Sequence, residues 1–406
     1  MPHALDPTYV ATVRRRSLLV LSLGQVLGGV AFGATVSLGA LLAAEVSGDE
    51  GLSGLATAAV TLGTAAFAVP LAALARRSGR RPALATGMLI ALVGVALVVL
   101  ARAVDQFPLL LAAFALIGAG QAANLQSRFA ASDLATDATR SRDLSLVVWA
   151  TTIGAVLGPN LVGPGEALGR LVGMPSLTGP YLFTVAAQLL GVAMYLIFLR
   201  PDPLVLAQRV ARDGGTSVST VRDHPAMARF AILAVAGSHA VMVSVMAMTP
   251  IHLMHHGAEI TVVGLTISLH IAGMYALSPV FGVLSDRMGR IPTILLGQAI
   301  LVASLLLAFA GQASVLAVGI ALVLLGLGWS ASTVAGAALL TESSSPEMRV
   351  ARQGRSDLTM SLVGAAGAIG AGVLLGWIGY GGLALVSLIV VAAVVAAALV
   401  ARQLDR

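Results

Sequence analysis

The sequence contains no cysteine and no lysine, and it has few charged residues of any kind. The absence of cysteine excludes disulfide bonds, thiolate metal sites and cysteine nucleophiles. Charged residues make up 10% of the chain, whereas 58% of the residues are hydrophobic and the mean hydropathy is +0.94. A soluble domain of 406 residues carries about 25% charged residues. The chain therefore lacks the polar surface that a water-soluble protein needs.

Apolar runs of about 20 residues recur along the whole sequence, and each can cross about 30 Å of hydrocarbon as a helix. In lipid, only helices and closed barrels satisfy every backbone hydrogen-bonding group, and these runs lack the alternation of barrel strands. The sequence predicts an all-α membrane protein with twelve transmembrane helices. The expected spans are 17–44, 53–75, 83–102, 107–130, 145–165, 179–199, 228–252, 260–284, 291–310, 314–340, 357–378 and 382–402.

All 24 basic residues are arginine, and the isoelectric point near 10.6 is also typical of proteins that bind nucleic acid. These arginines form short clusters between the apolar runs, a pattern that encodes membrane topology. We therefore expect a lipid bilayer as partner, and no nucleic acid. With the N-terminus inside, only Arg102 and Arg170 fall on the outer side of the membrane. The asymmetry predicts a multi-pass protein of the bacterial cytoplasmic membrane with both termini in the cytoplasm.

The longest polar stretch, residues 200–227, is rich in proline, glycine, serine and threonine. It predicts a cytoplasmic linker between an N-terminal six-helix bundle (1–199) and a C-terminal six-helix bundle (228–406). The two halves repeat each other at nearly constant offsets. The matched positions are 76–82 with 286–292, Asp133 with Glu342, Arg140 with Arg349, and Gly118-x-Gly120 with Gly326-x-Gly328. Such a duplication predicts two pseudo-symmetric bundles with a substrate site between them near the midplane.

The segment between the eighth and ninth expected spans contains a short charged motif. Gly289 permits a tight turn, and Asp286 can accept hydrogen bonds from the positive N-terminus of a neighbouring helix. Arg287 and Arg290 can pair with acids, so the loop can act as a conformational latch that holds one state. The run from Gly282 to Arg290 resembles the cytoplasmic signature of the major facilitator superfamily (MFS), often called motif A. The resemblance covers the whole chain and implies the MFS fold and secondary transport by alternating access.

The equivalent loop between the second and third spans departs from this signature. Ala72 stands where the first glycine of the motif belongs, and Arg76 stands where its aspartate belongs. The departure puts a latch in the N-terminal half in doubt. Arg76 is left to pair with an acid from another part of the chain.

The fifth span contains a packing motif of small residues, Gly154, Gly158 and Gly163, together with Pro159. The glycines permit close helix approach and Pro159 bends the helix, so we expect the segment to flex against the eighth span. The motif resembles MFS motif C, which is associated with exporters. Small-residue packing is common in helix bundles, so the motif does not fix the direction of transport.

Charged residues also gather where the fourth span ends. Arg128 and Asp133 are five residues apart, about a turn and a half of helix. They are interpreted either as a gate pair at the cytoplasmic mouth or as residues that only anchor the topology.

All 18 acidic residues fall in loops or at the ends of the expected spans. Many exporters of cationic drugs and many proton-coupled carriers place carboxylates in their cavity, where each needs a partner or a proton. The sequence therefore disfavours an antiporter of cationic drugs.

The seventh and eighth spans contain thioether and imidazole side chains at helical spacing. His239, Met242 and Met246 lie on one helix face, and His270 and Met274 are four residues apart on the next helix. Thioether and imidazole ligands suit Cu(I), which accepts two to four of them. These motifs resemble those of the CcoA-like (CalT) copper importers, another MFS group. That resemblance implies that Met242, Met246, His270 and Met274 bind metal; His239 is added from geometry.

Two other interpretations of these residues stay open. Methionine is a frequent gap filler in membrane helices, and a lone histidine can simply hydrogen-bond a neighbouring helix. The CcoA-like group also includes relatives that import riboflavin. The alternative cargo is therefore an organic metabolite or drug, with a cavity lined by polar and aromatic side chains. The candidate lining residues are Gln121, Asn124, Trp149, Asn160 and Trp329.

No arrangement of a nucleophile with a base and no phosphate-binding loop occurs in the sequence, so we do not expect an enzyme. No cofactor is implied, and copper enters only as a possible transported substrate. We expect a monomer that moves a small molecule or a metal ion across the membrane.

Overall fold

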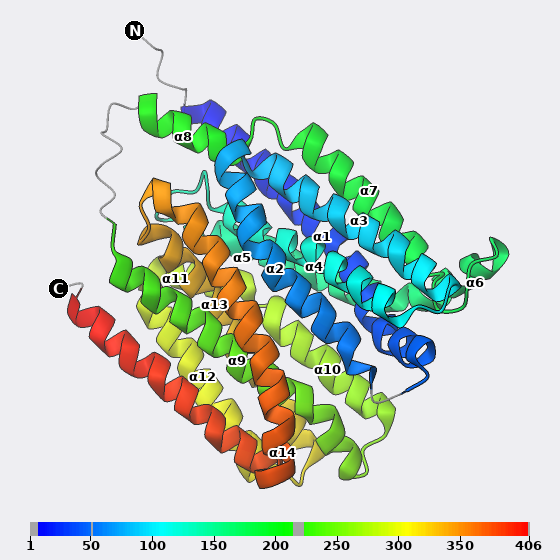
Figure 1. Cartoon of the computed structure of the whole chain (residues 1–406). Helices are drawn as coiled ribbons and strands as arrows, with labels where there is room; N and C mark the ends of the chain where they lie inside the picture. Colours follow the sequence, from blue (N-terminus) through cyan, green and yellow to red (C-terminus); the bar gives the residue numbers. More distant parts are fainter. Residues whose placement is uncertain (1–6, 50–51, 214–222, 405–406) are drawn as a thin grey trace. The chain divides into compact units, whose positions relative to one another are not determined.

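The structure is a computed structural model, and it describes residues 7–49, 52–213 and 223–404. These residues form helices and the turns between them, with no strand (Figure 1). The helices are α1 (Pro7–Ser47), α2 (Gly54–Ser78), α3 (Arg80–Ala103), α4 (Phe107–Ala131), α5 (Arg140–Asn160), α6 (Val162–Leu171), α7 (Tyr181–Phe198), α8 (Pro203–Asp213), α9 (Pro225–His255), α10 (Ile260–Tyr275), α11 (Ser278–Met288), α12 (Arg290–Ala310), α13 (Val315–Glu342) and α14 (Pro346–Leu404).

Twelve membrane-crossing segments can be identified in the described residues. Ten helical stretches are long and apolar enough to cross a bilayer, and α5 with α6 forms an eleventh that is bent by 54°. The backbone of Gly379 is non-helical (φ 69°, ψ 180°), so the 59 residues of α14 are two helices joined at a kink. At 1.5 Å per residue α14 is also far too long for one span of about 30 Å. The predicted all-α fold with twelve transmembrane helices is confirmed.

The bend between α5 and α6 has a local chemical cause. Pro164 has no N–H to donate to the carbonyl of Asn160, so the helical hydrogen-bond ladder is interrupted there. The bend follows Pro159, whose side chain lies outside what the structure describes. The expected linker at 200–227 contains a helix, α8, over Pro203–Asp213. Residues 214–222 of the linker lie outside the described part of the chain.

The chain forms two compact units that do not follow a simple division into halves. Unit 1 comprises Met1–Leu134, Ala150–Thr220 and Pro346–Leu358; unit 2 comprises Ala135–Trp149, Val221–Ser345 and Thr359–Arg406. In unit 1, α4 packs against α2, α3 and α1, and α7 packs against α1 and α3. In unit 2, α13 packs against α9, α10, α11 and α12. Each unit therefore has a central helix, α4 or α13, that supports the others.

The central helices make the same glycine contact in both units. A Cβ added at Gly118 of α4 would clash with the backbone of α2 at Val60 and Thr64. A Cβ added at Gly326 of α13 would lie 2.6 Å from the carbonyl oxygen of His270 on α10. The two helix pairs approach this closely because glycine has no side chain at the crossing point.

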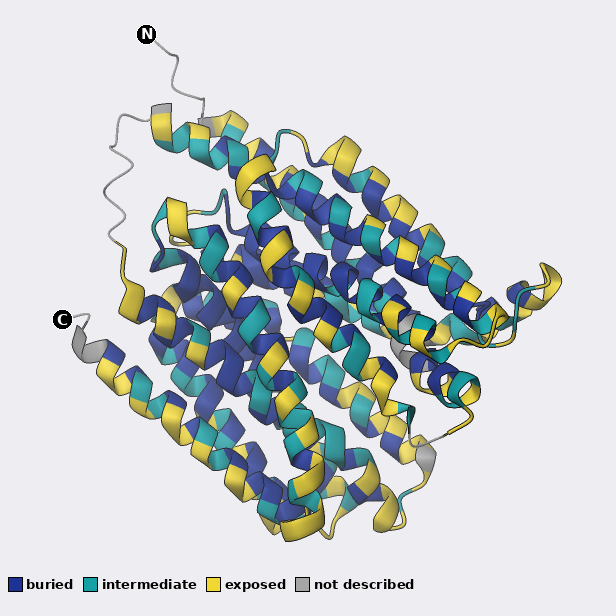
Figure 2. Ribbon diagram, viewed as in Figure 1, coloured by how far each residue is buried: buried dark blue, intermediate teal, exposed yellow. Residues whose placement is uncertain are grey.

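Large apolar side chains also cover the outside of the helices, as expected for a protein surrounded by lipid. Leu190 of α7 is 60% exposed, and Ile369 and Ile389 of α14 are 71% and 68% exposed. Figure 2 shows such exposed residues in stripes along α7 and α14, alternating with buried ones. The protein is therefore a multi-pass membrane protein whose helices are apolar on both their packed and their exposed sides.

The glycine crossings predict a selective loss of stability. Replacing Gly118 or Gly326 with alanine should destabilise the fold by about 1–3 kcal/mol, because the new methyl group overlaps backbone atoms. The control is Gly264→Ala on α10, where the added carbon meets nothing within 4 Å. Thermal unfolding in lipid nanodiscs should show a lower Tm for the first two variants and an unchanged or higher Tm for the control. Equal Tm values for all three would contradict the close contact.

Candidate functional site

The loop between α11 and α12 contacts the start of α5 within unit 2. The Asp286 carboxylate accepts hydrogen bonds from the backbone N–H groups of Ser141 and Arg142, both at 3.0 Å. N–H groups in the first turn of a helix lack partners inside the helix and carry partial positive charge. Gly289 makes the turn into α12 with φ 97°, which favours glycine. Arg287 is exposed. Asp286 thus caps α5.

Arg290 links Asp286 to acids on other elements of unit 2. Its Nη1 donates to Asp286 Oδ1 at 2.6 Å and its Nε to Glu342 Oε1 at 3.0 Å, while Nη2 donates to the Asp137 carbonyl at 2.7 Å. Arg140 also contacts Glu342, at 3.1 Å. Arg290 of α12 thus binds α11, α13 and the turn before α5, and Arg140 joins the first residue of α5 to the same glutamate.

A close helix contact accompanies this network, and unit 1 contains its counterpart with the residues exchanged. In unit 2, Gly282 lies so close to Ser145 that an added Cβ would overlap the serine hydroxyl. In unit 1, Ala72 occupies the position that matches Gly282, and the glycine is on the opposite helix, where a Cβ added at Gly354 would lie 2.5 Å from the Ala72 Cβ. Ala72 is therefore tolerated in unit 1 because its partner has lost a side chain.

The ion pair of Arg290 with Glu342 also has a counterpart in unit 1. Arg80 Nε donates to Asp133 Oδ2 at 2.8 Å and Arg80 Nη2 donates to Asp133 Oδ1 at 3.1 Å. The same Nη2 donates to Gln353 Oε1 of α14 at 2.7 Å. Burial raises the pKa of the Asp133 carboxyl above its ordinary value, although Arg80 partly opposes this rise. The offsets that match Arg80 to Arg290 and Asp133 to Glu342 in the sequence therefore mark the same ion pair.

The acid that the first loop lacks is partly replaced by Asp202. Arg76 is exposed at the end of α2. Asp202 Oδ2 accepts a hydrogen bond from the backbone N–H of Arg81 at 2.7 Å, beside Gly79 (φ 96°). Its Oδ1 caps α8 by accepting from Leu204 N at 3.0 Å. The acid thus binds the start of α3 and α8 instead of Arg76.

The expected pair of Arg128 with Asp133 is not formed. Arg128 Nη2 donates to Asp357 Oδ1 of α14 at 2.5 Å, and Asp133 is bound by Arg80. Arg128 and Asp357 are 4% and 0% exposed at their side chains, so the pair is buried. The spacing of Arg128 and Asp133 does not reveal these partners, because Arg80 lies 53 residues from Asp133 and Asp357 lies 229 residues from Arg128.

Asp357 also corrects the expectation that every acid lies in a loop or at a helix end. α14 begins at Pro346, so Asp357 lies about three turns inside the helix. The hydropathy pattern placed the start of this span at residue 357, because polar residues precede it. Because Asp357 is a buried carboxylate inside α14, the positions of the acidic residues no longer disfavour an antiporter of cationic drugs.

The small residues of the fifth span pack against α1. Gly154 lies against Gly29, where a Cβ would come within 2.7 Å of its Cα, and Gly158 lies against Gly33 at 2.8 Å. Gly163 has nothing within 4 Å of an added Cβ. Within unit 1, Gly154 and Gly158 therefore approach α1 closely, because the first and fifth spans bring paired glycines to one crossing. The expected flexing against the eighth span stays a prediction.

The predicted metal ligands on α9 and α10 lie in two different environments. Met242 and Met274 are 2% and 7% exposed in one apolar cluster, and Met246 packs against it. His270 is fully buried, and its Nδ1 is 2.7 Å from the carbonyl oxygen of Leu322 on α13. Across the described residues, no three His, Asp or Glu side chains come together as a metal site.

His239 belongs to an aromatic cluster instead. Trp329 Nε1 donates to His239 Nδ1 at 3.1 Å, and the Tyr275 ring meets the Trp329 ring edge to face with centroids 5.7 Å apart. The three residues come from α9, α13 and α10 of unit 2. Trp329 is 4% exposed, and the other two are half-buried. The cluster offers aromatic faces held by a hydrogen bond.

The expected cavity-lining residues divide by burial. Asn124 is buried against Gly28, and its Oδ1 has no hydrogen-bond partner in the described part of the chain. Trp329 is buried in the aromatic cluster, and Gln121 is half-buried. Trp149 is 40% exposed, and the exposed Asn160 donates to a carbonyl of its own helix at 2.6 Å. Asn124 and Trp329 are therefore the buried polar candidates in their respective units.

Polar contacts between helices were missed at two glutamines. Ser127 donates to Gln25 Oε1 at 2.7 Å, and Gln25 Nε2 donates to the Thr151 hydroxyl at 2.9 Å, which links α1, α4 and α5. Gln298 Nε2 similarly donates to hydroxyls on α9 and α13. A glutamine within an apolar run is the sequence signal that identifies such positions.

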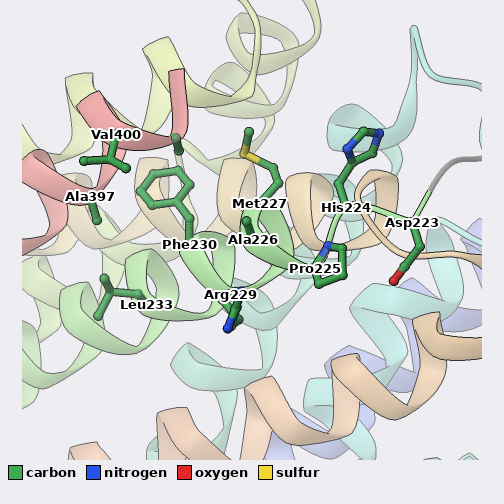
Figure 3. Close-up of a pocket in the computed structure, with 11 residues that line it drawn as sticks. Asp223, His224, Pro225, Ala226, Met227, Arg229, Phe230, Leu233, Ala397 and Val400 are labelled. Carbon is green, nitrogen blue, oxygen red and sulfur yellow. The ribbon is translucent and has the colours of Figure 1, made fainter. Parts of the chain in front are cut away.

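A surface cavity of about 610 Å³ lies in unit 2, between the start of α9 and the end of α14 (Figure 3). Phe230, Leu233, Ala397 and Val400 form its apolar wall, and Arg229 lies at its edge. It contains none of the predicted site residues.

The exchanged glycine contact of unit 1 predicts a rescue. Gly354→Ala should destabilise the protein by about 1–3 kcal/mol because its methyl group overlaps that of Ala72. Combining it with Ala72→Gly should restore most of the stability, with a coupling of at least about 1 kcal/mol in the double-mutant cycle. Thermal unfolding of the two single variants and the double variant measures this coupling; additive losses would rule out the contact.

Comparison with known proteins agrees with this architecture. The family model described as Major Facilitator Superfamily matches residues 21–259 and 231–406. The uncharacterised MFS-type transporters YddS and YdeG of Bacillus subtilis (strain 168) are 37% and 36% identical over 90% and 94% of this chain, and over 86% and 91% of their own lengths. The riboflavin transporter RfnT of Brucella anthropi is 31% identical over 90% of this chain and 92% of its own.

Solved structures share the fold. The human organic anion transporter MFSD10 superposes with a TM-score of 0.69 at 19% identity, covering 93% of this chain and 99% of its own. The transporter FucP, in the outward conformation, gives 0.68 at 15% identity, covering 94% and 97%. Twelve apolar segments, the charged loop after α11 and matches along nearly the whole length lead to one conclusion: the chain belongs to the major facilitator superfamily of transporters, which are not enzymes.

Proposed function

We propose that this transporter carries a small organic solute with a planar aromatic part across the bacterial cytoplasmic membrane. The observation that carries the proposal is the cluster of His239, Tyr275 and Trp329, three aromatic side chains from three helices of one unit. Aromatic side chains bind flat rings by stacking, and such binding needs few polar contacts. RfnT, which transports riboflavin by its name, is similar over nearly the whole chain and supports this class of cargo.

The proposed mechanism is alternating access by two bundles, residues 1–199 and 228–406, joined by the linker at 200–227. The arginine clusters support an orientation with both termini and the linker in the cytoplasm. Transport by a monomer, without a cofactor, is part of the proposal. Relatives in Bacillus support a bacterial cytoplasmic membrane.

The charged networks described above supply the conformational control in this proposal. Gly282, Asp286, Arg287, Gly289 and Arg290 are the latch of unit 2, in which Asp286 and Arg290 carry the hydrogen bonds. Arg128 and Asp133 belong to the cytoplasmic gate, each through its own partner on another helix rather than through each other. Breaking such buried pairs costs several kcal/mol unless water or another partner replaces them, so they hold one state until the bundles move.

The organic cargo is tested by uptake of a panel that includes riboflavin into proteoliposomes. Trp329→Ala should reduce uptake of the transported compound about tenfold. A stacked aromatic ring contributes about 0.5–1.5 kcal/mol, and the hydrogen bond to His239 that is also lost contributes about 1 kcal/mol. Trp377→Ala is the matched control, because Trp377 is 80% exposed and should leave uptake unchanged. Equal uptake by wild type, Trp329→Ala and Trp377→Ala would contradict the role of the cluster.

A second candidate cargo, copper(I), is favoured by the state of His270. A carbonyl oxygen only accepts hydrogen bonds, so the contact to Leu322 requires the proton on Nδ1. Nε2 is then the unprotonated nitrogen that binds metals, and it is buried without a hydrogen-bond partner within the described residues. Met274 lies one turn further along α10, in the same apolar cluster as Met242. The donor set suits a soft ion.

Uptake of ⁶⁴Cu into cells at limiting copper separates the two cargoes. If copper is carried, Met242→Ala and His270→Ala should each lower uptake about tenfold or more, because each removes one of a few soft ligands. The matched control is Met288→Ala, since Met288 is 53% exposed. Undiminished uptake in both site variants would eliminate the copper cargo and leave these residues as packing.

A further inference from the structure

Four charged side chains form a buried, charge-balanced cluster in unit 1. Arg80 binds Asp133 and Arg128 binds Asp357, and all four side chains are at most 4% exposed. Gln353 and Asp357 lie four residues apart on α14, so one face of this helix contacts both arginines. The first part of α14, residues 346–358, is therefore held in unit 1 by these pairs.

The two carboxylates are bound differently. Both oxygens of Asp133 accept from Arg80, at 2.8 and 3.1 Å. Asp357 is bound by Arg128 through Oδ1 alone, and its Oδ2 is buried with no hydrogen-bond partner in the part of the chain that the structure describes. A buried anion with an oxygen that accepts no hydrogen bond is costly, and a proton on that oxygen removes the charge.

From this geometry we infer that Asp357 is a proton-binding site, and that the start of α14 is held on α4 only while this carboxylate is ionised. The groups that face the carboxylate are Arg128 of α4, which binds it, and Arg80 of α3 with its partner Asp133. With Asp357 ionised, the four buried side chains carry no net charge, because two arginines balance two carboxylates. The half-buried Asp202 and Arg349 also act on Asp133, with opposite charges. The proton therefore changes the net charge of the buried cluster by one unit.

The step itself moves no electrons. A proton from water forms an O–H bond with the Asp357 carboxylate, and the ion pair with Arg128 is broken. Arg128 is then a buried cation without a counter-ion, which is unstable until water reaches it. The protonated form therefore favours separation of α14 from α4, and the proton returns to water once the group is exposed. Proton binding to Asp357 and separation of the start of α14 from α4 are thus linked.

The inference rests on the proposed function only in that the protein works by alternating access. The test needs no transported solute. A wrong cargo therefore cannot affect its result, and the two proposals can fail independently. The chain has no cysteine, so a single introduced thiol can report exposure. Val350 of α14 is 2% exposed in a cluster with Ala72, Ala75, Ala83 and Leu204, and Val350→Cys reports separation of this segment.

The measurement is the rate of maleimide labelling in nanodiscs from about pH 7.5 to about pH 5.5, where desolvated carboxyl groups can titrate. Each rate is divided by that of Ser78→Cys, an exposed reporter in the same unit, which cancels the ionisation of the thiol. The ratio should rise at least about fivefold on acidification, because one linked proton changes a population by up to about tenfold per pH unit.

Three variants decide the outcome. Asp357→Asn should give a high ratio that no longer depends on pH, and Asp357→Glu, which keeps a titratable group, should retain the dependence. Glu347→Gln removes an exposed acid from the same helix and should behave as wild type. A normal pH dependence in Asp357→Asn would overturn the assignment, and so would a ratio that is independent of pH in the wild type.

Discussion

Charges buried within this protein must be neutralised by other parts of the chain, because lipid cannot do it, and much of the structure follows from that constraint. Arg80 with Asp133 joins α3 to the turn after α4, and Arg290 with Glu342 joins the consecutive helices α12 and α13. Arg128 with Asp357 joins α4 to α14, 229 residues apart. Their positions determine which helix ends stay together. Since the net gain from a buried ion pair is small but the cost of breaking one is large, such pairs select a conformation more than they add stability.

The duplicated halves show that a contact can persist when its residues do not. The close approach of Gly282 to Ser145 in unit 2 reappears in unit 1 as Ala72 against Gly354. The spacing between the helices requires one glycine in the pair, on whichever side it stands. The aspartate of the first loop is not replaced in this way: Asp202 binds the start of α3 instead.

The proposed cargo site and the proposed proton-binding site lie in different units. The aromatic cluster around Trp329 and the buried His270 belong to unit 2, whereas Asp357 and its arginines belong to unit 1. α5 and α14 each continue from one unit into the other, at Trp149–Ala150 and at Leu358–Thr359. The part of α14 that binds Arg128 therefore belongs to the same helix as residues of the unit that holds the aromatic cluster.

The sequence by itself determined the fold class, the number of spans, the repeat and the charged loop after α11, because each depends on local hydropathy or on residues close together in the chain. It also contained the offsets that pair Arg80 with Arg290 and Asp133 with Glu342. Only the tertiary structure decided that Arg128 binds Asp357, that Asp133 binds Arg80 and that Gly154 packs on Gly29. These partners are distant in the sequence, and hydropathy marks where lipid lies but not which helices face each other.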